Sequence, residues 1–325
     1  MTTFLGARRF ERTLALTTAL LCSLSAWPAT ADDTDWSWLN GVYSGEIGSR
    51  FWYGMGQTGK DLYGTDGKTM VSRLTYSGLA GSSGEVYGQI NERNYFIKGV
   101  AGLGKLLMRG SLQDEDFPPL TAPYSSTDSS LHAGDIGYVT FDGGAYIAQT
   151  PNARLGVFAG YGFLHQAVNA YGCTQTASNP SICAPPISDS TAVISQSNYW
   201  NALRVGVNGE MEFGKGWRLK GEAAALPFVK FDGTDDHWLR ICDTTGCFTG
   251  GIPEDGTGWG YQLEAMLDYT LANRVTVGVG GRYRHMETSG NSHFEGHVVG
   301  GGYGPQRVDW KTDYYGLTAH AGWQF

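Results

Sequence analysis

Apolar and polar residues alternate over many strand-length segments of the chain. In residues 203–213 the odd positions are apolar or glycine, whereas the even positions include Arg204 and Glu210. The same period of two recurs over residues 261–269 and 275–284. Successive side chains of a β-strand point to opposite faces, so each segment predicts a strand with one apolar and one polar face.

This alternation fits either a soluble β-sandwich or the wall of a membrane barrel, because both cover one apolar face. The composition favours the barrel, since 48 glycines, 18 tyrosines and 10 tryptophans at a mean hydropathy of −0.25 suit aromatic girdles around a polar lumen. Residues 315–325 also alternate and end on Phe325, like the last strand of a bacterial outer-membrane barrel. Beyond residue 31 there is no run of about eighteen apolar residues that could form a transmembrane helix.

Turn-forming segments alternate between short and long, as expected when one membrane side carries tight turns and the other carries loops. The expected short turns are residues 91–94, 151–152, 214–216 and 271–273. The expected long loops are residues 55–68, 114–131, 173–195, 235–257 and 287–312. We therefore predict an all-β fold, a transmembrane antiparallel β-barrel of about ten strands with long extracellular loops.

The first residues have the parts of a secretory signal peptide. A basic stretch precedes an apolar run over residues 14–27, and the small-residue sequence Ala29-Thr30-Ala31 follows. We predict a signal peptide at residues 1–31 and an outer-membrane β-barrel at residues 32–325.

The expected mature chain is acidic. The whole chain has 23 Lys and Arg against 31 Asp and Glu, and the signal segment holds three and one of these, which leaves a net charge of −10. This balance disfavours nucleic acid as a partner. It would suit a cationic substrate, although a general acidic surface explains it as well.

Four cysteines remain after the signal segment, two in each of two expected loops. Cys173 and Cys183 share one loop, and Cys242 and Cys247 share another. Four cysteines allow three pairings, and we expect the within-loop disulfides because each pair is close in sequence and lies in an oxidising compartment. Metal binding by these cysteines is a weaker alternative.

Two short clusters of ionisable residues mark the ends of expected strands. Asp114-Glu115-Asp116 ends the third strand, which begins near residue 95, and Asp235-Asp236-His237 ends the seventh, which begins near residue 217. Side chains two apart share a face, so the outer members of each cluster face one side and the middle members point away. Facing each other across the barrel mouth, the clusters could activate water; the simpler alternative is that both are solvated loop charges.

The strand that leads to the second cluster alternates inconsistently. Arg218, Lys220 and Glu222 put the even positions toward the lumen, but Asp235 and His237 are odd. A one-residue bulge near Pro227 would bring both sets to the same side. Without such a bulge the Asp-His pair would face outward.

Four segments, in order along the chain, resemble the omptin family of ten-stranded outer-membrane endopeptidases, whose active-site groove lies at the extracellular rim. The segments are residues 72–76, 112–117, 151–161 and 235–238. The second is similar to the family's Asp-x-Asp segment followed by an aromatic residue, and the fourth to its Asp-acidic-His-aromatic segment.

The resemblance implies a mechanism without a covalent intermediate, metal or cofactor. His237 would be the base that activates water, and Asp235 its orienting partner. Asp114 and Asp116 would form the opposing carboxylate pair, with Asp114 holding the water. The implied activity is cleavage of peptide or protein substrates at the surface of a bacterial cell, with the groove facing the exterior and outer-membrane lipid around the barrel.

The chain departs from the family pattern at several positions. The charged residues through which the family binds lipopolysaccharide fall near Phe163 and His165. The first-strand acid of the family's pocket for a basic side chain falls near Ser49, and Asp232 would supply another acidic wall only with a shifted register. Strict cleavage at Arg or Lys is therefore not predicted.

Two hypotheses remain. The first is the omptin-like endopeptidase, a hydrolase. The second is a non-enzymatic outer-membrane barrel that serves as a small channel, an adhesin or a scaffold. They differ in whether Asp114, Asp116, Asp235 and His237 converge on one water-sized space. We expect no metal site, because the loop histidines His293 and His297 lack the helical context that their spacing requires.

Overall fold

The computed structural model describes residues 43–325, apart from 107–109 and 118–121. The expected signal peptide lies outside these residues. Strands make up most of the described chain, with one short 3₁₀ helix, η2 (Trp238–Arg240). The strands are β1 (Tyr43–Tyr63), β2 (Met70–Ser77), β3 (Gly81–Glu92), β4 (Tyr95–Leu106), β5 (Ser111–Asp116), β6 (Ser125–Gln149), β7 (Ala153–Gln175), β8 (Ile187–Phe213), β9 (Trp217–His237), β10 (Ile252–Thr270), β11 (Val275–His293) and β12 (Pro305–Gln324).

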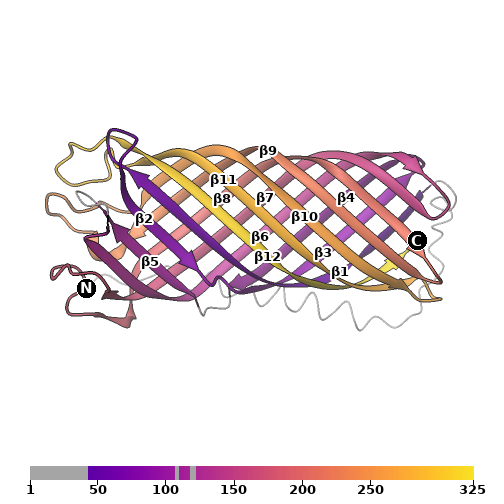
Figure 1. Cartoon of the computed structure of the whole chain (residues 1–325), viewed down its shortest axis with the longest axis horizontal. Helices are drawn as coiled ribbons and strands as arrows, with labels where there is room; N and C mark the ends of the chain where they lie inside the picture. Colours follow the sequence, from indigo (N-terminus) through magenta and orange to yellow (C-terminus); the bar gives the residue numbers. More distant parts are fainter. Residues whose placement is uncertain (1–42, 107–109, 118–121) are drawn as a thin grey trace, which may run out of the picture. The chain divides into compact units, whose positions relative to one another are not determined.

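The strands form one closed antiparallel sheet. From β6 to β12 each strand pairs with the next in chain order, and β1 pairs with β12 from Glu46↔Gln324 to Leu62↔Val308, which closes the barrel (Figure 1). β2 and β3 lie end to end along β1, and β4 and β5 lie end to end along β6. Because β2 and β3 share one position in the ring, and β4 and β5 another, the described strands form a ring of ten positions. This confirms the predicted antiparallel β-barrel. Among the described residues, no helix has the length and apolar character needed to cross a membrane.

The connections alternate between short and long, as predicted. The short ones are residues 93–94, 150–152, 214–216 and 271–274, and the long ones are 64–69, 117–124, 176–186, 238–251 and 294–304. All five long connections begin later than predicted, and four of them end earlier. Asp114, Asp235 and His237 consequently lie within strands, where the paired backbone fixes their direction.

Large apolar side chains cover the outer face over a limited height. On β1 this band runs from Ile47 to Met55, and on β12 from Tyr315 to Trp323. About nine to eleven residues of a tilted strand cross a membrane, so the band has the expected height. Toward the long connections the outer face becomes polar, with Lys230 and Asp232 on β9. The strands therefore continue beyond the membrane-spanning segment and carry both ionisable clusters with them.

A bulge in β9 occurs where the sequence predicts one. Gly258 of β10 pairs with Val229, but Gly260 pairs with Leu226, so β9 has one extra residue at this point, around Pro227. The pairing of β9 with β8 shows the same extra residue in β9. Leu226 and Val229 are both buried, which means that the inward positions change from even to odd numbers. The bulge is what turns the end of β9 toward the interior.

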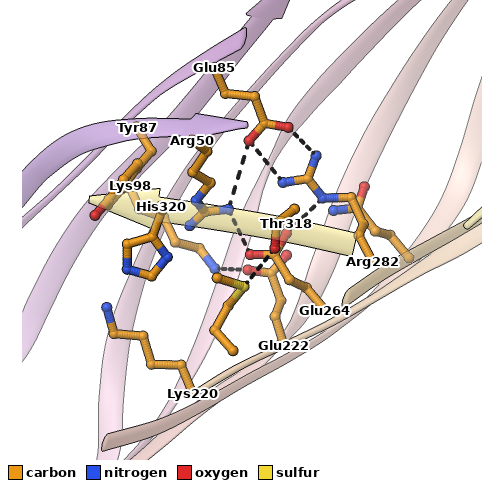
Figure 2. A network of polar contacts seen from close by, with 12 residues as sticks. Arg50, Glu85, Tyr87, Lys98, Lys220, Glu222, Glu264, Arg282, Thr318 and His320 are labelled. Atoms are coloured by element: carbon orange, nitrogen blue, oxygen red, sulfur yellow. Dashed lines mark hydrogen bonds and ion pairs between the residues drawn. The ribbon is translucent and has the colours of Figure 1, made fainter. Parts of the chain in front are cut away.

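Charged side chains cross the lumen at the level of the apolar band. Arg50 on β1 donates to Glu264 on β10 (Nη1 to Oε1, 2.8 Å), and Arg282 on β11 donates to Glu85 on β3 (Nη1 to Oε1, 2.8 Å). These strands are not neighbours in the sheet, so the contacts span the interior, as Figure 2 shows. Buried charges are tolerated because each has a partner of opposite sign.

An aromatic layer separates these charges from the far end of the barrel. Trp200, Phe231 and Trp310 are fully buried, with ring centroids 4.7 Å apart between Trp200 and Phe231 and 5.0 Å apart between Phe231 and Trp310. The ammonium of Lys60 lies 5.3 Å from the Trp310 ring centroid. The candidate site lies directly beyond this layer, on the side of the long connections.

Candidate active site

The Asp235–His237 pair lies at the end of β9. The Nε2 atom of His237 is 2.9 Å from Oδ2 of Asp235. Asp235 is 5% exposed and pairs in register with Gln196 of β8 and Ile252 of β10. Two strands therefore hold the aspartate backbone, and the hydrogen bond fixes the histidine ring with Nδ1 as its free nitrogen.

Asp114 and Asp116 lie on β5, across the barrel from β9. Along the ring, β6, β7 and β8 separate β5 from β9 on one side, and a longer run of strands separates them on the other. Asp114 pairs with Leu74 of β2 and Thr127 of β6, and its Oδ1 is 3.5 Å from Oγ of Ser72, at the outer limit of a hydrogen bond. Asp114 interacts electrostatically with His237, Asp116 and Asp235. The two clusters therefore face each other. As predicted, the middle residues, Glu115 and Asp236, lie on the other face of their strands.

Burial and neighbouring charges shift the pKa values of Asp114 and Asp116 on β5. Burial raises the pKa of Asp114 to about 6; the positive charge of His237 opposes this shift, and the negative charge of Asp116 adds to it. Burial also raises the pKa of Asp116. Asp114 is thus largely ionised at pH 7 and takes up a proton in mildly acidic solution.

In the Asp235–His237 pair, neighbouring charges outweigh burial and favour the charged form of each group. Burial opposes the charged form of His237, but Asp235 and then Asp114 outweigh it and raise the histidine pKa above its ordinary value. Burial likewise opposes ionisation of Asp235, but His237 and Lys60 hold the pKa of this carboxyl well below its usual range. The site therefore contains an ionised aspartate beside a histidine whose pKa is raised.

Two further charged residues complete the site, and the sequence reasoning missed both. Nζ of Lys60, on β1, is 2.6 Å from Oδ2 of Asp235 and 2.7 Å from Oε1 of Glu254, on β10. Both side chains are almost fully buried. The alternation of β1 does place Lys60 on the same inward face as Trp52, but which acids it meets depends on how the barrel closes.

The structure places Asp232 and Ser49, the two positions compared with the family's substrate pocket, on the outer face of the barrel. Asp232 is on the outer face of β9 and pairs with Lys230 there (Oδ2 to Nζ, 2.9 Å), because the bulge makes odd positions inward. Ser49 is exposed on the outer face of β1, between Ile47 and Phe51 in the apolar band. The inward residue of β1 beside the dyad is Lys60. The assignment of Asp232 to substrate binding, which required a shifted register, is therefore wrong.

Both predicted disulfides are present at the end of the barrel that carries the long connections: the first joins the end of β7 to the connection that follows it, and the second lies within the connection after β9. Cys173 bonds Cys183 and Cys242 bonds Cys247, with Cα atoms 5.5 and 5.4 Å apart. The second disulfide ends at Cys247, next to Phe248, whose ring lies edge-on to His237 with centroids 5.6 Å apart. Phe248 also forms a small apolar cluster with Ile252 and Val298. This loop covers one side of the histidine.

A possible metal-ligand set lies elsewhere in the barrel. In the part of the chain that the structure describes, ligand atoms of Glu46, Asp268 and His320 lie within 4.8 Å of one another. These residues are in the lumen near the short turns, away from the dyad. Lys220 lies 3.1 Å from Glu46 and 3.0 Å from Asp268, and this ammonium already compensates both carboxylates.

A closed antiparallel barrel with an apolar outer band and a charged lumen defines the class of bacterial outer-membrane β-barrels. No protein-family model and no curated protein sequence matches the chain. The structure is similar to that of the outer membrane protease OmpT from Escherichia coli, with a TM-score of 0.68 and 15% identity, covering 87% of this chain and 97% of that one.

Two other outer-membrane barrels resemble the chain less closely. The translocator domain of the autotransporter NalP from Neisseria meningitidis has a TM-score of 0.37 and 12% identity, covering 97% of this chain and 98% of that one. The outer membrane protein OprG from Pseudomonas aeruginosa has a TM-score of 0.32 and 10% identity, covering 86% and 96%. At such identities, the likeness to OmpT establishes the outer-membrane barrel fold and leaves the activity to the site itself.

Proposed function

We propose that the protein is an omptin-like endopeptidase of the bacterial outer membrane that cleaves polypeptides at the cell surface. The observation that carries the proposal is the hydrogen-bonded Asp235–His237 pair, which faces the carboxyl of Asp114 from across the barrel. The similarity to OmpT supports it. The site lies beyond the apolar band, at the end with long connections, which in such barrels is the extracellular end.

The proposed mechanism gives each group a role. Asp235 accepts a hydrogen bond from the Nε2–H of His237 and leaves Nδ1 to take a proton from water. Ionised Asp114 accepts a hydrogen bond from the other hydrogen of that water and holds the water between the two walls. The resulting hydroxide adds to the peptide carbonyl carbon. The C–N bond then breaks, and the leaving amine takes the proton from His237, which restores the neutral imidazole.

The excess of carboxylates suits a polypeptide substrate with positive charge. Asp114, Asp116 and Asp235 all lie at the mouth, and the net charge outside the signal segment is negative. Favourable charge at a mouth raises the rate of encounter with an oppositely charged ligand. The surrounding partner is outer-membrane lipid, and the proposed steps use no metal or cofactor.

The lumen argues against the small channel among the non-enzymatic alternatives. Ion pairs between strands that are not neighbours, such as Arg50 with Glu264 and Arg282 with Glu85, occupy the interior at membrane level. The aromatic layer of Trp200, Phe231 and Trp310 lies above them. A solute that crossed the barrel would have to disrupt both layers.

Digestion of a mixed peptide library tests the proposal. The folded barrel in detergent with outer-membrane lipid should cleave peptides in the library, and the His237→Ala variant should lose at least about a hundredfold of that rate, since acid–base assistance is worth about 10² to 10⁴. Folding of both samples is checked by the heat-dependent shift on electrophoresis. Absence of cleavage by the folded wild type would favour an adhesin or scaffold instead.

A further inference from the structure

One oxygen atom of Asp235 has two nitrogen partners. Oδ2 is 2.9 Å from Nε2 of His237 and 2.6 Å from Nζ of Lys60. The other oxygen, Oδ1, is buried and has no hydrogen-bond partner among the described residues. The position of the histidine and the position of the lysine are therefore set by the same atom.

Lys60 is itself held by a second buried acid. Its ammonium is 2.7 Å from Oε1 of Glu254, and Oε2 of Glu254 accepts from Nε1 of Trp310 (3.2 Å) and Nε2 of Gln196 (3.4 Å). Lys60 comes from β1, Glu254 from β10 and Gln196 from β8. Three strands thus fix the ammonium beneath the dyad.

We infer that Lys60 is a positioning residue for the Asp235–His237 pair, and that Glu254 serves to hold Lys60 in place. This inference rests on the proposed endopeptidase function. Lys60 does not need to touch the substrate. It acts by keeping Asp235 ionised and fixed, so that the histidine ring presents Nδ1 to the water.

The need for a cation follows from the two acids. Asp235 and Glu254 both lie within hydrogen-bond distance of Nζ of Lys60 and are both buried. Two buried carboxylates this close cannot both stay ionised without a compensating charge. If Asp235 took up the proton, it would lose its charge and orient the imidazole poorly. Lys60 removes that conflict.

Lys60 also affects the protonation of His237. Its positive charge disfavours protonation of His237, whereas Asp235 and Asp114 favour it. The other charged groups around the dyad are Asp116 on β5, Asp236 on β9, Glu254 on β10 and Arg240 in η2. Without Lys60, carboxylates would dominate this set, and His237 would remain protonated to a higher pH and be unable to accept a proton from water.

The test compares Lys60→Met with the double variant Lys60→Met/Glu254→Gln. The first removes the cation and leaves two buried acids; the second removes one charge of each sign and leaves Asp235 with His237 alone. Lys230→Met is the matched control, because Lys230 pairs with Asp232 on the outer face. Each barrel is checked for folding by its heat-dependent shift on electrophoresis, and kcat, KM and their pH profiles are then measured.

We expect Lys60→Met to lower kcat by at least about tenfold with little change in KM, a part of the 10² to 10⁴ available to acid–base assistance. The double variant should recover most of kcat, but with the acid limb of kcat/KM moved up by roughly half a pH unit or more. Lys230→Met should match the wild type. A merely structural lysine would leave the pH profile of every folded variant unchanged, and that result would overturn the inference.

A titration that does not need catalysis separates this inference from the proposed function. The pKa of His237 is measured by NMR of histidine-labelled protein in the wild type and in the double variant. A higher pKa in the double variant supports the role of Lys60 even if the wild type cleaves no peptide, in which case only the proposed function fails. An unchanged His237 pKa overturns the inference whatever the wild type cleaves. If Lys60→Met does not fold, the double variant alone decides by the same two readouts.

Discussion

The lumen and the rim of this barrel both bury charged residues, but the buried acids clearly outnumber the cations only in the cluster at the rim. In the lumen, Arg50 and Arg282 are matched by Glu85 and Glu264. At the rim, the carboxylates outnumber the cations: Asp114, Asp116, Asp235 and Glu254 surround Lys60 and His237. A balanced cluster holds strands together, whereas an unbalanced one shifts pKa values toward neutral pH, where proton transfer is useful.

The comparison shows that burial of charge by itself does not mark a functional site. The lumen pairs are as buried as the rim pairs, and they likewise connect strands that are not neighbours in the sheet. What distinguishes the rim is that Asp114 has a pKa of about 6 and His237 titrates above its ordinary range. Substitutions in the two regions should therefore have separable effects, on cleavage at the rim and on stability in the lumen.

The largest expected effect is on cleavage, from the carboxyls of β5. Asp114→Asn and Asp116→Asn should each lower kcat/KM by at least about 10², because both carboxyls face the dyad. Glu115→Gln is the matched control, since Glu115 lies between them on the other face of the strand, where its charge acts on Arg73. It should stay within about tenfold of the wild type. Comparable losses in all three variants would mean that the rim needs only negative charge.

The lumen should respond in stability. Glu264→Gln leaves Arg50 and Arg282 short of a partner, and removal of one member of a buried pair costs about 3 kcal/mol or more. The change is measured by urea unfolding in detergent or lipid. Asp135→Asn is the control, because the Lys105–Asp135 pair is exposed and should be worth less than about 1 kcal/mol. Equal destabilisation by both substitutions would contradict the account of the lumen.

Reduction of the disulfides should affect the rim more than the barrel. Loops as short as those closed by Cys173–Cys183 and Cys242–Cys247 are worth about 2 to 3 kcal/mol at most in the chain-entropy model. The reduced protein should keep its heat-dependent electrophoretic shift, while cleavage falls because Phe248 no longer has a fixed place against His237. Loss of the shift on reduction would show that the loops support the barrel itself.

The smallest expected effect is on the pH profile. As pH falls through the raised pKa of His237, the base becomes protonated, so kcat/KM should fall with a midpoint above about 6.5. The negative charge of Asp114 contributes to that rise. Residual activity of Asp114→Asn should therefore show a midpoint at lower pH, opposite in direction to the shift expected on removal of Lys60. A midpoint unmoved by Asp114→Asn would argue against contact between the clusters.

Local patterns predicted the fold and half of the site. Alternation gave the strands, and the change of parity between Glu222 and Asp235 was enough to predict the bulge at Pro227. The same spacing of two placed Asp235 with His237. Lys60 and Glu254 could not be predicted in this way, because they lie 175 and 19 residues from Asp235 along the chain and meet it only once the barrel closes with a particular register. Asp232 lies on the outer face because odd positions of β9 point inward after the bulge.

The most direct test of the central claim compares Asp235→Asn with Asp236→Asn in barrels shown to fold normally. The two substitutions remove the same charge from adjacent positions of β9, but only Asp235 accepts the hydrogen bond of His237. The account predicts that Asp235→Asn lowers peptide cleavage by at least about 10², while Asp236→Asn stays within about tenfold of the wild type. Equal losses in the two variants would contradict it, because they would show that no Asp235–His237 dyad carries the reaction.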